Sequence, residues 1–199
     1  MSGVKKGNNM KELSSLYAGF ICETSYDKLP PEVVRQAKQR ILDLVGVSLA
    51  GYKLMEFPQI VINYITSLGG TPEATIIQTK RKFPAINAAL ANSACAHAID
   101  MDDGHRFAAL HPGTVVIPAA VAAAEMVGAN TKELIAGIVV GYEIMIRIGM
   151  AINPSSLGRG FHTTGTVGTF GAAAAAANIM KLSHEETIGA LALASKPCC

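Results

Sequence analysis

The sequence predicts an all-α protein, and three observations support this. Apolar residues recur three or four positions apart along nearly the whole chain, as they do on the buried face of a helix. The segments with this spacing are bounded by proline, glycine and capping residues that start or stop helices. Only residues 74–78 have the composition of a β-strand. We therefore expect a single helical domain over residues 1–199.

These signals predict eight helices and one large loop. A Pro-Pro pair at residues 30–31 fits the first turn of a helix. Thr131 is expected to cap another helix, and Ser183 and Glu186 have the Ser-x-x-Glu spacing of a capping box. Residues 153–161 are expected to form a loop. The expected helices cover residues 9–23, 31–51, 58–68, 84–101, 118–127, 132–150, 164–180 and 187–194.

The composition restricts the classes of function. Half of the residues are hydrophobic and 16% are charged, below the roughly one quarter that is usual, so we expect surface to be buried in an oligomer or against further chain. The net charge is only +2 and the basic residues are scattered, so we expect no nucleic-acid partner. The uncharged runs are too short or too polar for a membrane span, which needs about 20 mainly apolar residues. The four cysteines form no Cys-x-x-Cys pair and the N-terminus is polar, which favours a cytoplasmic location.

A dense group of ionisable residues, at positions 97–111, lies between two apolar helices. His97 and Asp100 are three positions apart, hence on one face of an alanine-rich helix. We expect Asp100 to be buried on that face, where a carboxylate needs a partner such as His97. Asp102 and Asp103 are expected either to belong to the site or to form only a solvated helix end.

The same group offers ligands for a metal ion, since carboxylate oxygens and imidazole nitrogens both bind metals. Its spacing matches no metal-binding motif such as His-Glu-x-x-His. We therefore expect neither a metal nor a cofactor, and a metal-dependent hydrolase remains an alternative. The candidate ligands are His97, Asp100, Asp103, His105 and His111.

A second segment, residues 158–168, is a glycine-containing loop that enters a helix. The free N–H groups at such a helix start favour an anion, and the guanidinium of Arg159 suits a carboxylate. His162 can exchange a proton near neutral pH. Alternatively, Thr163 or Thr164 only caps the helix and His162 is an ordinary loop residue. Together, the two segments supply the groups for proton abstraction next to a carboxylate.

These residues resemble the MmgE/PrpD family. The similarity lies in the run Ala-His-Ala-Ile-Asp-Met-Asp-Asp-Gly-His-Arg followed by His-Pro-Gly, and in the run Gly-Phe-His-Thr-Thr-Gly-Thr-Val-Gly. The segments at 43–51 and 87–97 are also similar, and the resemblance covers about residues 10–194.

The resemblance implies a large helical domain and a smaller α/β lid, usually in a homodimer and without a metal. This chain matches only the N-terminal part of the helical domain, so we expect the domain to be incomplete relative to the family, with the lid absent. The family includes 2-methylcitrate dehydratase, cis-aconitate decarboxylase and iminodisuccinate epimerase. The implied catalytic residues are Asp100, His111 and His162, which line a pocket for a di- or tricarboxylate.

Further residues are expected to contact the substrate. Some family members carry threonine directly after the Asp-Asp pair, where this chain has Gly104, so the substrate contact or proton relay at that place would be either absent or supplied by His105. Other basic and tyrosine site residues of the family lie downstream of the matched part. The expected substrate contacts are Asp103, Gly104, His105, Arg159 and Thr163.

The resulting hypothesis is a lyase or isomerase, with dehydration, a carbon–oxygen lyase reaction, as the favoured chemistry. The alternative is a catalytically incomplete helical fragment, or a subunit that needs a separate C-terminal part. The abrupt end of the chain at Lys-Pro-Cys-Cys favours this alternative.

Overall fold

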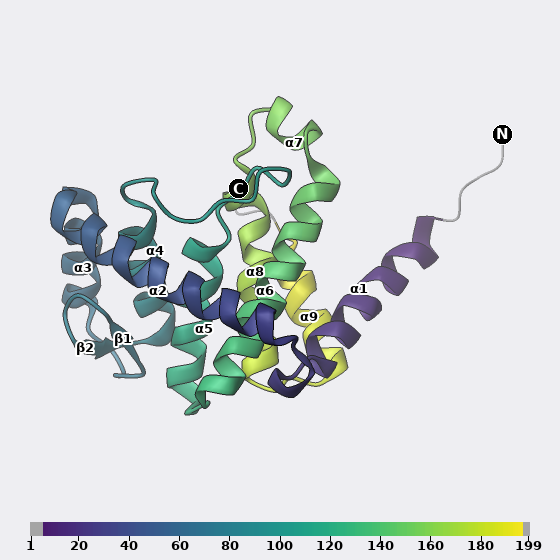
Figure 1. The fold of residues 1–199 in the computed structure, drawn as a ribbon, viewed down its shortest axis with the longest axis horizontal. Coiled ribbons are helices and arrows are strands. Elements are labelled where there is room, and N and C mark those ends of the chain that lie inside the picture. Colours follow the sequence, from purple (N-terminus) through teal and green to yellow (C-terminus); the bar gives the residue numbers. More distant parts are fainter. Residues whose placement is uncertain (1–5, 197–199) are drawn as a thin grey trace.

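A computed structural model describes residues 6–196 and confirms the all-α class. Within that range lie nine α-helices, one short 3-10 helix (Tyr26–Lys28) and one two-stranded sheet (Figure 1). The helices are α1 Lys6–Glu23, α2 Pro31–Leu54, α3 Glu56–Leu68, α4 Ala85–His97, α5 Gly113–Val127, α6 Thr131–Ile152, α7 Ser155–Gly158, α8 Thr163–Ile179 and α9 His184–Ala194. The strands are β1 Ala74–Ile76 and β2 Arg81–Phe83, paired antiparallel.

The capping predictions are half right. Ser183 and Glu186 form the expected capping box at the start of α9. At α6, however, the cap is Asn130 and not Thr131, because the Asn130 side chain accepts hydrogen bonds from the backbone N–H groups of Lys132 and Glu133. The Asn130 N–H in turn donates a hydrogen bond to the Glu133 carboxylate, which completes a second capping box.

Helix α5 begins five residues earlier than predicted. Proline favours the first turn of a helix, but Pro118 lies inside α5, which starts at Gly113. The Val116 N–H donates to the Pro112 carbonyl, so the helical pattern is established before the proline is reached. This places the start of α5 directly after His111. A short helix, α7, also forms inside the predicted loop.

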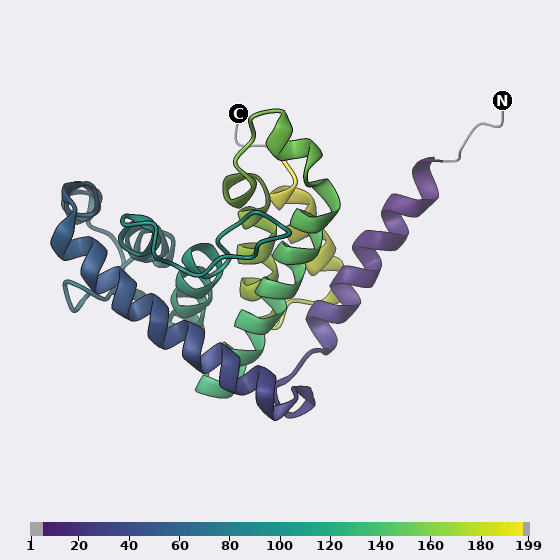
Figure 2. The same cartoon turned by 45° about the horizontal axis from the view of Figure 1, so that its top comes forward.

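The core is formed by α5, α6 and α8, which stand side by side, while the long helix α2 crosses them (Figures 1 and 2). Helices α6 and α8 approach closely at Gly141 and Gly171. A Cβ on Gly141 would lie 2.5 Å from Val116 Cγ1 and 2.8 Å from the Gly171 carbonyl oxygen. The small residues in these helices therefore permit the close contact.

By length and composition, α6 could cross a membrane. Half of its most apolar window is buried inside the structure, where α6 packs against α8, and Arg147 pairs with Glu143 on its exposed side. An apolar helix in the core of a fold meets the same length and composition criteria, so α6 gives only weak support for a membrane span.

Replacing Gly141 with alanine is expected to destabilise the fold by about 1–3 kcal/mol, because the added methyl group overpacks the contact between α6 and α8. Gly46→Ala is the matched control, since Gly46 lies inside α2 with no atom within 4 Å of its would-be Cβ. That change should stabilise the helix by about 0.5–1 kcal/mol. Urea unfolding of both variants measures the two effects, and equal shifts would contradict the close-contact explanation.

Candidate functional site

The site is built on the loop between α4 and α5, residues 98–112. This loop runs across the end of the helical core toward α7 and the start of α8 (Figures 1 and 2). It is fixed by a two-residue bridge in which the His105 N–H donates to the Leu110 carbonyl over 2.8 Å. The His111 N–H donates to Thr164 Oγ1 over 3.0 Å, which fastens the end of the loop to α8.

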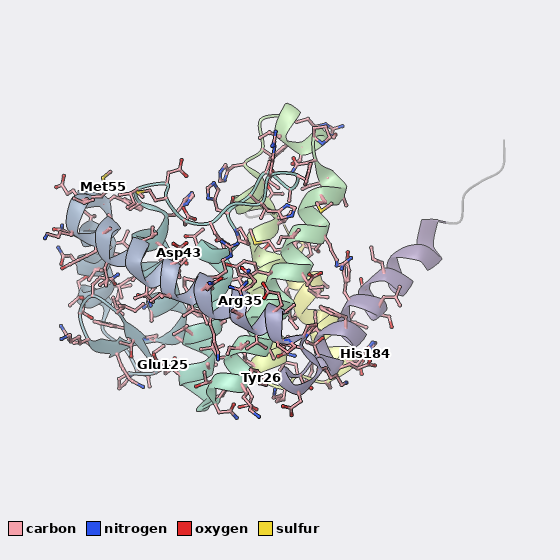
Figure 3. The ribbon with its side chains drawn as sticks, viewed as in Figure 1. Tyr26, Arg35, Asp43, Met55, Glu125 and His184 are labelled. Carbon is pink, nitrogen blue, oxygen red and sulfur yellow. The ribbon has the colours of Figure 1, made fainter. Side chains whose placement is uncertain are left out.

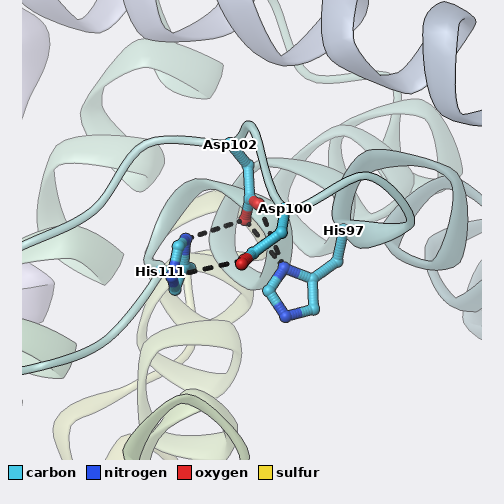
Figure 4. Close-up of side chains that lie close together, drawn as sticks. All are labelled: His97, Asp100, Asp102 and His111. Atoms are coloured by element: carbon cyan, nitrogen blue, oxygen red, sulfur yellow. Dashed lines mark hydrogen bonds and ion pairs between the residues drawn. The ribbon is translucent and has the colours of Figure 1, made fainter.

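Four side chains converge at this loop (Figure 4). Both oxygens of Asp102 lie close to His97 Nδ1, at 3.0 and 3.1 Å. His111 Nδ1 is 3.5 Å from Asp102 Oδ2, and His111 Nε2 is 3.8 Å from Asp100 Oδ1. One buried carboxylate is therefore hydrogen-bonded to His97 and adjacent to His111, and a second, exposed carboxylate lies on the other side of His111.

The expectation that Asp100 is buried was wrong. Helix α4 ends at His97, so the helical spacing on which the expectation rested stops before Asp100. Asp100 then adopts a positive φ of 53°, and its side chain is 80% exposed. The buried carboxylate is that of Asp102, whose side chain is fully buried, and it replaces Asp100 as the partner of His97.

Asp103 is not part of a solvated turn either. It accepts hydrogen bonds from the Gly113 N–H at 2.9 Å and from the Tyr142 hydroxyl at 3.1 Å, with Arg40 Nε 3.8 Å away. Burial raises the pKa of the Asp103 carboxyl, against the lowering effect of these partners. Burial, together with the Asp103 charge, also raises the pKa of the Tyr142 hydroxyl. Both carboxylate oxygens are thus engaged by the protein, where the sequence predicted a substrate contact.

The structure brings the second predicted segment to the first. His162 precedes α8 as its N-cap residue and is exposed. Its ring centre lies 6.3 Å from that of His97, whose ring is also 5.2 Å from that of His111. Three histidines from two distant segments therefore gather around the position of His97.

The other residues predicted to contact the substrate differ in their burial and in their hydrogen-bond partners. Thr163 is buried, and its hydroxyl is hydrogen-bonded to the side chain of Asn153, so it acts as a packing residue. His105 Nδ1 accepts the Ala108 N–H. Arg159 is exposed and lines a separate surface hollow beside α7. A Cβ on Gly104 would come 4.0 Å from His111 Cε1, so this position adjoins the cluster and has room for a side chain.

A cavity of about 570 Å³ opens beside the cluster, between α6, α8 and the end of α9. His162 belongs to both the cluster and the cavity wall. The wall is mainly apolar, with Thr166 and Lys196 among its polar groups. The cavity volume is within the usual range for a small-molecule site.

Comparison with known proteins decides the family. The family model described as the MmgE/PrpD N-terminal domain matches residues 16–197. The chain belongs to the MmgE/PrpD family. This result agrees with the resemblance seen in the motifs at 96–113 and 160–168.

Curated relatives of the chain are cis-aconitate decarboxylases. A cis-aconitate decarboxylase-like protein of Aspergillus oryzae is 28% identical over 197 residues, which cover 95% of this chain and 40% of that protein. The Aspergillus terreus cis-aconitate decarboxylase is 29% identical over 87% of the chain and 36% of its own length. The Homo sapiens enzyme is 29% identical over 93% and 39%. The chain thus spans about two fifths of the length of these relatives.

Two members of the cluster are not singled out as catalytic residues by the sequence. The pattern indicates His97 only as a metal ligand or a structural partner, and Asp102 only as a residue that either joins the site or forms a solvated helix end. Their five-residue separation matches no helical or strand spacing, so no pattern linked them. Three residues from other parts of the chain also support the site, and no sequence pattern around them predicts this role. They are Tyr142, Asn153 and Thr164.

The raised pKa of Asp103 gives a pH-dependent prediction. The folded protein holds this proton to a higher pH than the unfolded chain, so the contribution of Asp103 to stability falls as pH rises above the ordinary aspartate range. Asp103→Asn keeps an acceptor for Gly113 and removes the titration. The free energy of unfolding of the variant minus that of the wild type should therefore increase from pH 4 to pH 7. Urea unfolding at several pH values tests this, and a difference that decreases with pH would contradict it.

Proposed function

We propose that the chain is the N-terminal part of a lyase that acts on a small di- or tricarboxylate, with proton transfer at a carbon next to a carboxylate. The observation that carries the proposal is the convergence of His97, His111 and His162 beside aspartates at one loop. Membership of the family and the names of the relatives support the lyase class.

The proposed roles follow from the geometry. His111 and His162 are the groups that remove or deliver a proton, since imidazole exchanges protons near neutral pH. Asp100 is exposed at the mouth of the cluster, where its carboxylate lies 3.8 Å from His111 Nε2 and can orient that ring. These assignments keep the three catalytic residues predicted from the sequence.

The start of α8 supplies the anion-binding element. His162 caps this 17-residue helix without a side-chain hydrogen bond to its first turn. We propose that N–H groups of that turn bind a substrate carboxylate, which the helix dipole favours. At α5, in contrast, Asp103 already accepts the first N–H, so that helix start is satisfied from within the protein.

Two reactions fit this chemistry. Dehydration, favoured from the sequence, removes a proton next to a carboxylate and expels a hydroxyl group. Decarboxylation, which the names of the relatives suggest, breaks a carbon–carbon bond and delivers a proton to the carbon that remains. Both can use an imidazole as the acid or base beside a bound polycarboxylate. A homodimer and a cytoplasmic location remain predictions that accompany this proposal.

His111→Ala is expected to lower turnover by at least about 100-fold, the scale of general acid–base catalysis. The assay uses the protein that carries these residues, with cis-aconitate and 2-methylcitrate as substrates, and follows carbon dioxide release or loss of water. His184→Ala is the matched control, because His184 lies at α9 and bonds to Ser15, away from the cluster. Unchanged turnover in His111→Ala would contradict the assignment of His111 as a group that removes or delivers a proton. If the 199-residue chain binds cis-aconitate without turnover, the alternative of an incomplete catalytic part is favoured.

A metal-dependent hydrolase is the second candidate, and one observation favours it. His97, Asp100, Asp102 and His111 can each offer one ligand atom, and those atoms all lie within 4.8 Å of one another. Two imidazoles and two carboxylates form a donor set that suits zinc or iron. The ligand set differs from the predicted one, since Asp102 replaces Asp103 and His105.

Metal content distinguishes the two candidates. Under the lyase proposal, purified protein should hold less than stoichiometric zinc, manganese or iron, and turnover should survive dialysis against a chelator. Elemental analysis before and after chelation measures this. One metal ion per chain, together with activity that is lost on chelation and restored by the metal, would favour the hydrolase.

A further inference from the structure

We infer that Asp102 is a positioning residue that keeps a proton on Nδ1 of His97 and thereby leaves His97 Nε2 as a proton acceptor inside the candidate site. The hydrogen-bond part of this inference rests on geometry alone, and its catalytic consequence rests on the proposed function. It adds His97 and Asp102 to a site whose predicted members are Asp100, His111 and His162.

The burial of Asp102 dictates where the proton lies. Its side chain is fully buried, and both of its oxygens are within 3.1 Å of His97 Nδ1. An ionised carboxylate can only accept hydrogen bonds, and a buried one without a donor is strongly unfavourable. His97 must therefore supply the donor, so its Nδ1 carries the proton and its neutral form has a free lone pair on Nε2.

His111 does not compete for this role in the same arrangement. Its Nδ1 is 3.5 Å from Asp102 Oδ2, and it is a buried atom without a hydrogen-bond partner among the described residues. Asp102 is thus hydrogen-bonded to His97 and only adjacent to His111. A change at Asp102 should accordingly act first on the ring of His97.

The orientation of the His97 ring leaves its Nε2 atom unoccupied by either aspartate. Figure 4 shows the second ring nitrogen of His97 turned away from both aspartates. The ring is 5.2 Å from that of His111 and 6.3 Å from that of His162, so His97 is the common neighbour of the two proposed acid–base groups. A ring held at Nδ1 by a buried carboxylate presents Nε2 in a fixed direction, which is the purpose of such a partner.

Two other histidines of the chain carry their proton on Nε2 and not on Nδ1, so they serve as internal references for His97. His184 Nε2 lies 3.0 Å from the Ser15 carbonyl, which can only accept, so His184 carries its proton on Nε2. His105 Nδ1 accepts the Ala108 N–H, so His105 also carries its proton on Nε2. One spectrum can therefore compare His97 with two internal controls.

Long-range nitrogen–proton NMR of the ¹⁵N-labelled chain, at about pH 8.5 where an ordinary histidine is neutral, reports the proton position in each ring. His97 should be the Nδ1–H form, and His105 and His184 the Nε2–H form. In Asp102→Asn the side-chain amide can donate toward His97, so the Nε2–H form of His97 should become the main one. Asp27→Asn is the matched control, because Asp27 pairs with Lys132 away from the cluster, and it should leave His97 unchanged.

The outcomes separate this inference from the proposed function. An Nε2–H form of His97 in the wild-type spectrum overturns the inference, and that measurement needs neither a substrate nor a stable variant. The predicted form of His97, together with no lyase activity in the longer protein that carries these residues, upholds the positioning of His97 and overturns the proposed function instead. Where turnover is present, Asp102→Asn should lower kcat by about 100-fold or more and change KM less. An unchanged kcat would overturn the catalytic consequence.

Discussion

The site depends on the hydrogen bonds of Asp103. This carboxylate joins the N–H of Gly113, at the start of α5, to the hydroxyl of Tyr142 in the middle of α6. It satisfies a helix start that would otherwise leave a donor buried, and it fixes the loop over residues 98–112 to two core helices. Figure 3 draws the side chains along the whole ribbon. Because Asp102 and Asp103 are adjacent, any shift of Asp103 moves the carboxylate that holds His97.

Two neighbouring aspartates therefore have different tasks, and the backbone explains why. The loop around them is neither helix nor regular strand, and the chain bends at Asp102, so the two side chains reach different partners. Asp102 faces the imidazoles and Asp103 faces the helices. The helix predicted through residue 101 would instead have buried Asp100 on its inner face and left Asp102 and Asp103 just beyond its end. The early end of α4 at His97 is thus the local event that determines the site.

The sequence predicted the fold class, most helix positions and the meeting of two chemical segments. Helical spacing and capping depend on residues only a few positions apart, so the sequence alone predicts them, as the capping box at Ser183 shows. The burial of Asp102 could not be read in this way, since it follows from contacts with His97 and from a loop held by Thr164 of α8. The start of α5 was also missed, because the local preference of Pro118 for a first turn was overridden by the hydrogen bonds and contacts around Gly113.

A proton and a metal ion would compete for the same atoms in this cluster. A cation bound through His97 Nδ1 needs the lone pair that the hydrogen bond to Asp102 replaces with a proton. The contacts of 3.0 and 3.1 Å between this nitrogen and the two oxygens of Asp102 fit a donor and its acceptor. A carboxylate that fixes one imidazole, beside two more imidazoles and an open helix start, is suited to moving protons at a bound carboxylate.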